Sequence, residues 1–174
     1  MMKTIILKKF KYQSVFGEKT FEQVSLRIPP QLNNRKIRSI DDLEGQEYNI
    51  PASELKRMER DLALDFFSKH YRSILNGERT IFVDELKGIQ DILEVNRSEF
   101  GKLLGLHKGS VTNLFKGKSM KSTLSILIME RLGMELARPG SARNMLEGGK
   151  PHGKVLEASR VINGVRYAHN DAAA

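Results

Sequence analysis

The chain has 174 residues, no cysteine and a formal net charge of +8, from 29 Lys and Arg side chains against 21 Asp and Glu. This length fits one domain of ordinary size or two small ones, and the lack of cysteine excludes disulfides, cysteine-ligated zinc and cysteine nucleophiles. No apolar run approaches the roughly 18 residues of a spanning helix and no signal-peptide pattern begins the chain, so we expect a cytoplasmic protein without metal or cofactor, whose positive charge favours a polyanionic partner.

The amino-terminal segment has the chemistry of β-strands. Aromatic and β-branched residues gather in 10–16 and again in 24–28, with Gly17 in the turn between them, so we predict a hairpin or meander. A polar link over 33–46 follows. Four acids in and beside this link are candidates for a carboxylate metal centre, but no His or Lys signature accompanies them, and we favour a solvated loop: Asp41, Asp42, Glu44 and Glu47.

A long amphipathic helix is predicted from Pro51 to Leu75. Its apolar positions fall near one helical stripe, which is the pattern of a helix with one buried face: Leu55, Met58, Leu62, Phe66 and Ile74. Asn76 and Gly77 both tolerate the left-handed backbone found just past a helix end, so they close the helix. We place a domain boundary near Gly77 to Thr80.

Four short helices are predicted after this boundary, over 85–93, 97–104, 108–115 and 122–132, and they are enough for a compact bundle. Glycine and proline become frequent past Ala137, which is typical of a linker or mobile tail. Within that tail, Asn163-Gly164 suits the loop of a small hairpin. The predicted fold class is therefore α+β: a β-rich module with a long helix over 1–77, an all-α bundle over 78–138, and a flexible basic tail over 139–174.

The excess positive charge is concentrated in the bundle. Between Arg97 and Arg131 there are seven Lys or Arg residues and two acids, Glu99 and Glu130. Such a run alone is typical of a solvated surface. Here a binding surface is favoured instead, because the run coincides with two predicted helices joined by a tight turn.

The first of these two helices begins at Asn96, whose side chain can accept a bond from a free amide at the helix start. Glu99, three residues further on, completes a capping-box pattern. Gly105 supplies the left-handed backbone that the turn requires. Leu106 is expected to fill the angle between the two helices. Their buried faces are predicted to comprise Phe100, Leu103, Leu104, Val111 and Leu114.

The second helix presents a polar edge to solvent. Its outward or leading residues can meet phosphates and base edges when a helix enters the major groove: Lys108, Gly109, Ser110, Thr112, Asn113 and Lys116. His107 precedes this helix, and we expect it to cap the helix or touch a phosphate; a satisfied structural role is favoured over a base contact.

The segment from Glu85 to Ala137 resembles the Xre/Cro repressor family of helix-turn-helix domains. The resemblance implies that Arg97 binds a phosphate, and that Lys108, Thr112 and Asn113 face bases. It also implies that the residues flanking the Gly117 turn, Lys116 and Lys118, clamp backbone phosphates. Two positions depart from the family pattern: Gly101 replaces the usual alanine, and Gly109 stands where many relatives carry a base-reading side chain, so direct base readout is expected to be thinner.

The order of modules is similar to that of antitoxins of the MqsA type, whose front module binds a toxin. That family holds its front module together with cysteine-ligated zinc, and this sequence has no cysteine. The apolar strand residues must then stabilise the module instead of the metal: Phe10, Phe21, Val24 and Ile28.

Ile126 and Met129 lie away from the predicted buried stripe of the last helix, so they need a second cover. A homodimer contact is one interpretation, because domains of this kind commonly read two half-sites with two-fold symmetry. Packing against the long helix or the tail of the same chain is the other.

We therefore expect a sequence-specific DNA-binding repressor that is the antitoxin of a type II toxin-antitoxin system and represses its own operon. Its expected partners are double-stranded operator DNA, a small toxin protein and a second copy of the chain. The alternative is a stand-alone Xre-family regulator whose front module senses a ligand or mediates dimerisation. Catalysis is not expected, since no acid/base or nucleophile constellation is present.

Overall fold

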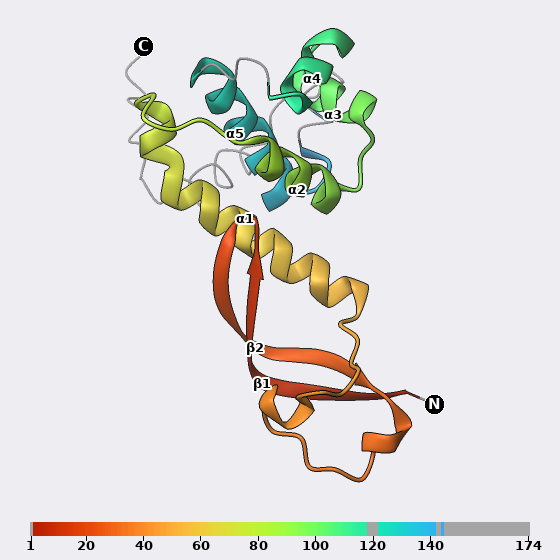
Figure 1. Ribbon diagram of the computed structural model, residues 1–174. Helices are drawn as coiled ribbons and strands as arrows, with labels where there is room; N and C mark the ends of the chain where they lie inside the picture. Colours follow the sequence, from red (N-terminus) through yellow and green to blue (C-terminus); the bar gives the residue numbers. More distant parts are fainter. Residues whose placement is uncertain (1, 118–121, 142–143, 145–174) are drawn as a thin grey trace, which may run out of the picture. The chain divides into compact units, whose positions relative to one another are not determined.

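The computed structural model describes residues 2–117, 122–141 and 144 (Figure 1). Two strands, β1 (Lys3–Ser14) and β2 (Gly17–Ile28), are followed by the short 3-10 helices η1 (Pro30–Leu32) and η2 (Asp41–Leu43). Five α-helices complete the order: α1 (Ala52–Leu75), α2 (Val83–Leu93), α3 (Arg97–Leu104), α4 (Lys108–Phe115) and α5 (Ser122–Ala137). The predicted α+β class is confirmed. Nearly all of the predicted tail, including the hairpin expected at Asn163-Gly164, lies outside the described residues.

The chain divides into two compact units, Met1–Leu62 and Ala63–Ala174, so the division falls within α1. The sequence placed the boundary later, near Gly77. The difference arises because the second half of α1 buries Phe66, Phe67 and Ile74, and this half belongs with the helical unit that follows it.

In the first unit, β1 and β2 form an antiparallel hairpin whose register runs from Ser14 opposite Gly17 to Lys3 opposite Ile28. The hairpin buries Leu7 and Phe10 on β1, and Phe21 and Val24 on β2. Residues three apart normally lie on opposite faces of a strand. Here the backbone of Gln23 takes a left-handed φ of 55°, and the buried face changes between the two halves of the hairpin.

Two further contacts complete the first unit. The phenol of Tyr12 donates a hydrogen bond to the Glu59 carboxylate of α1; burial, followed by this carboxylate, raises the pKa of Tyr12 well above its usual range. Arg27 and Asn49 exchange both backbone bonds, N–H to C=O, at 2.7 and 2.8 Å, which adds a single antiparallel bridge outside β2. In the connecting segment, which is otherwise largely exposed, the side chains of Leu32 and Leu43 are buried.

The second unit packs four helices and the end of α1 around a core that includes Ile81, Leu86, Ile89, Phe100 and Leu103. The predicted bounds of α3 and α4 are confirmed; α2 begins two residues before its predicted start, and α5 continues to Ala137. Among the residues that the structure describes, no helix is both long and apolar enough to cross a membrane.

Candidate nucleic-acid interface

The start of α3 is fixed by a capping box. The Asn96 side-chain oxygen accepts bonds from the backbone N–H groups of Ser98 at 2.9 Å and Glu99 at 3.0 Å. In return, the Glu99 carboxylate accepts the Asn96 N–H at 3.0 Å. The reciprocal pair satisfies three amide donors that a bare helix end leaves open, and it confirms the role predicted for Asn96.

The turn between α3 and α4 consists of residues 105–107. Gly105 has a left-handed φ of 66°, and the Leu106 N–H donates to the Gly101 carbonyl at 2.8 Å. An added Cβ at Gly101 would lie 2.8 Å from the Val111 Cγ2 atom and 3.3 Å from the Leu106 carbonyl oxygen. Glycine at this position therefore allows α3 and α4 to approach closely.

The inner face of α4 is held by Val111, Leu114 and Phe115, all buried. The Phe115 ring meets the Phe100 ring of α3 edge to face, with centroids 5.4 Å apart. These contacts fix which side of α4 faces solvent.

The outer face of α4 carries the predicted polar set. The side of the helix and its two ends expose Lys108, Gly109, Ser110, Asn113 and Lys116. Thr112 is half-buried, and its hydroxyl donates to the Lys108 carbonyl at 3.0 Å. The hydroxyl proton is engaged within the helix, so the Thr112 oxygen and methyl group remain for an outside contact. Lys118 lies outside the described residues.

The leading end of α4 favours anions. No acid lies in its first turn, and Lys108 is the first helical residue. His107 occupies the N-cap position but its side chain makes no capping bond, so the expectation that this side chain caps the helix is wrong. The first N–H groups of α4 therefore remain available to an acceptor such as a phosphate oxygen.

Arg97, the predicted phosphate ligand on α3, is exposed. Its guanidinium lies over the Phe115 ring, 5.0 Å from the centroid. Stacking on an aromatic face restricts the guanidinium while leaving its donors free at the edge. Glu99 is the one acid in residues 97–117, against four Lys and Arg residues, so the α3–α4 surface keeps a positive balance.

On α5, Met129 is buried, with 1 % of its surface exposed, whereas Ile126 is half-buried. Met129 is therefore covered within its own chain and is not a free contact for a second copy; that assignment is corrected. The alternative was packing against the long helix or the tail of the same chain, and the structure shows that Met129 is buried.

An ion pair between Arg79 and Glu85 was not predicted from the sequence. Glu85 is 5 % exposed; its carboxylate accepts the Phe82 N–H at 2.8 Å and pairs with the Arg79 guanidinium at 2.5 Å. The same guanidinium lies 4.7 Å from the centroid of the Phe66 ring. Glu85 lies three residues after the N-cap position of α2, which is the capping-box position of a glutamate. The N-cap residue is Phe82, however, and not one of the polar residues that usually mark a helix start.

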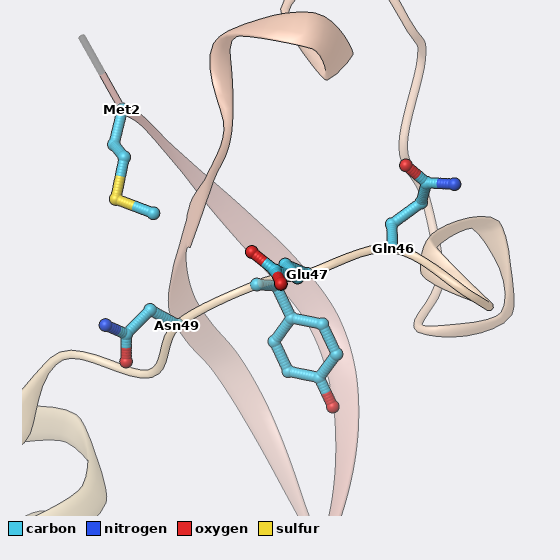
Figure 2. A pocket seen from close by; sticks show the side chains of 5 residues that line it. Met2, Gln46, Glu47 and Asn49 are labelled. Atoms are coloured by element: carbon cyan, nitrogen blue, oxygen red, sulfur yellow. The ribbon is translucent and has the colours of Figure 1, made fainter.

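Asp42, one of the four candidate metal-binding acids, is hydrogen-bonded to nearby backbone groups. Asp42 accepts backbone N–H bonds from Arg38 at 2.7 Å and Ser39 at 3.0 Å, and these bonds lower the pKa of its carboxyl group. Within the described ranges, no group of three or more His, Asp or Glu residues is placed to hold a metal ion. Figure 2 shows an open pocket nearby, lined by exposed residues and with a single titratable acid: Met2, Gln46, Glu47, Tyr48 and Asn49.

Comparison with protein-family models, with curated proteins and with solved structures gives no match for this chain.

Proposed function

We propose that the chain is a sequence-specific DNA-binding protein that acts as a transcriptional repressor. One observation carries the proposal: α4 is anchored from behind by Val111, Leu114 and Phe115, so that its opposite edge stays exposed and carries amide, hydroxyl and ammonium groups. A short helix held in this way after a three-residue turn suits the recognition helix of a helix-turn-helix unit.

The side chains divide into two roles. Asn113 is exposed on α4, and an Asn side chain can pair with adenine through two hydrogen bonds in the major groove. Arg97 and Lys116 lie at the margins of the same surface as exposed cations, which suits contacts to backbone phosphates. The open amide end of α4 adds neutral donors for one more phosphate.

Binding selection from a pool of random duplexes, followed by fluorescence anisotropy, tests this proposal. Asn113→Ala should weaken the selected duplex by about 1 to 3 kcal/mol and leave random duplexes nearly unchanged. Lys116→Ala should weaken all duplexes alike, and Lys36→Ala, an exposed lysine of the first unit, should change neither. Equal effects of the Asn113 and Lys116 variants on selected and random duplexes would contradict the assignment of roles, and no selectable sequence would contradict the function.

The antitoxin role belongs to the same proposal. Its support is that residues 1–62 form a compact unit of their own, which leaves a surface free for a protein partner while the other unit holds DNA. Co-purification with the product of an adjoining short reading frame is the expected result. A stand-alone regulator predicts instead that no such product binds.

A further inference from the structure

We infer that the outer edge of β1, over Thr4 to Lys8, is the docking site for an acidic, extended segment of a partner protein, which joins the hairpin as an additional strand. The inference deepens the protein-partner half of the proposed function and does not depend on DNA binding.

The backbone of Arg27 fixes the direction of this edge. Arg27 uses both its N–H and its C=O for Asn49, on the far side of β2 from β1. Antiparallel partners alternate between pairs that exchange backbone bonds and pairs that do not. Thr4, which lies opposite Arg27, is therefore in a pair without such bonds, and it directs its N–H and C=O away from β2. Ile6, two residues further on, does the same.

The outer edge of β1 has no partner strand among the described residues, since the sheet there consists of β1 and β2 with the single Asn49 bridge beyond β2. Thr4, Ile6 and Lys8 are all exposed, and the Ile6 side chain is 66 % exposed, although its strand neighbour Leu7 is fully buried. Open strand edges are templates for pairing with another chain. An exposed isoleucine beside open backbone groups gives such a strand an apolar contact as well.

The charge of β1 selects the occupant. Every charged residue from Lys3 to Ser14 is a lysine: Lys3, Lys8, Lys9 and Lys11. Lys11 is paired with Glu18 at 2.9 Å, and Lys3 donates to the Asn33 carbonyl at 3.3 Å. Lys8 and Lys9 have no ion pair within the described part of the chain. Like charges that face each other across strands destabilise a sheet, whereas opposite charges stabilise it.

A second copy of β1 is therefore a poor occupant. Antiparallel self-pairing centred on Ile6 sets Lys3 of one copy opposite Lys9 of the other, twice in each dimer. A strand with alternating acids instead places its carboxylates on one face of the sheet, beside Lys8 or beside Lys9, because neighbouring residues of a strand point to opposite faces. The same lysines keep the free edge from joining identical chains, which is a common use of lysine on edge strands.

Amide hydrogen exchange and chemical shifts of the full-length, isotope-labelled protein test the proposal with two synthetic peptides. One peptide alternates Glu and Val, and the other alternates Lys and Val. The Glu-Val peptide should slow exchange at Thr4 and Ile6 and shift their amide signals, whereas the Lys-Val peptide should not. A double charge reversal, Lys8→Glu with Lys9→Glu, should weaken the Glu-Val peptide by about tenfold or more; Lys36→Glu is the matched control and should leave its binding unchanged.

Ile6→Pro tests the edge itself. Its N–H points away from β2, so proline there should leave the hairpin ladder intact and abolish peptide binding. If this variant fails to fold, the double charge reversal tests the proposal by itself, because it leaves the backbone groups of β1 unchanged. Three results overturn the proposal: neither peptide affecting Thr4 and Ile6, duplex DNA protecting them instead, or protection that rises with protein concentration without any peptide. DNA affinity measured on the same variants separates this failure from a failure of the repressor assignment.

Discussion

Gly101 sets how closely α3 and α4 pack. The nearest atoms to a Cβ there are the Val111 methyl at 2.8 Å and the Leu106 carbonyl at 3.3 Å, and a β-branched side chain has little freedom to move aside. Gly101→Ala should therefore destabilise the second unit by about 1 to 3 kcal/mol, as other overpacking substitutions do. Urea unfolding followed by circular dichroism measures the change.

Gly109 provides the matched control. It lies in α4, and an added Cβ would meet nothing within 4 Å. Gly109→Ala should stabilise the unit by about 0.5 to 1 kcal/mol, because alanine loses less backbone freedom on folding than glycine does. Equal effects of the two substitutions would show that helix propensity, and not close packing, determines the residue at position 101.

His70 couples the stability of the second unit to pH. Its ring packs on Phe66, with centroids 4.8 Å apart. Burial, then the positive charges of Arg79 and Lys69, lower the pKa of His70 below its usual 6.5. The unfolded chain takes up this proton more readily than the folded one, so stability is complete above pH 6.5 and falls as the pH drops toward the folded pKa.

Urea unfolding at about pH 7.5 and about pH 5.5 checks this sign. The unmodified protein should lose stability on acidification, and His70→Gln, which does not titrate, should lose less. A variant that loses the same amount would assign the pH dependence to other groups.

At the scale of elements, the cap of α3 makes a measurable contribution. The Asn96 side chain accepts two backbone N–H bonds, and the Asn96 N–H donates to the Glu99 carboxylate. Asn96→Ala should cost about 0.5 to 2 kcal/mol, whereas Asn96→Asp should keep most of the stability because aspartate caps as well as asparagine. Thermal unfolding compares the two, and an aspartate variant as unstable as the alanine variant would argue against the cap as the cause.

The elements predicted well are those with signals in neighbouring residues. Asn96 with Glu99 marked the start of α3, and Gly105 its end, so the bounds of α3 and α4 were predicted to the residue. The change of buried face at Gln23 and the burial of Met129 depend on contacts far apart in the chain. A single sequence contains no local signal for such contacts, so both were missed.

At the scale of the molecule, α1 is shared between the two units. The sequence instead predicted that the whole helix belongs to the first domain. Asn76 and Gly77 are a strong local signal for a helix end, and the domain boundary was therefore predicted directly after them. The division at Leu62 instead follows from which core each helical turn contacts, since Met58 and Leu62 belong to the first unit and Phe66 and Phe67 to the second. Each unit therefore has a core of its own.

The salt dependence of the proposed DNA binding tests the whole electrostatic surface. Each phosphate neutralised by Lys or Arg releases condensed counterions, so the logarithm of the binding constant should fall linearly with the logarithm of salt concentration. Arg97→Ala and Lys116→Ala should each reduce this slope by about 1, while Asn113→Ala should leave it unchanged. Lys36→Ala, in the other unit, should also leave it unchanged. Anisotropy titrations over a range of KCl concentrations give the slopes, and a slope that Lys36 changes as much as Lys116 does would place the DNA on a different surface from α4.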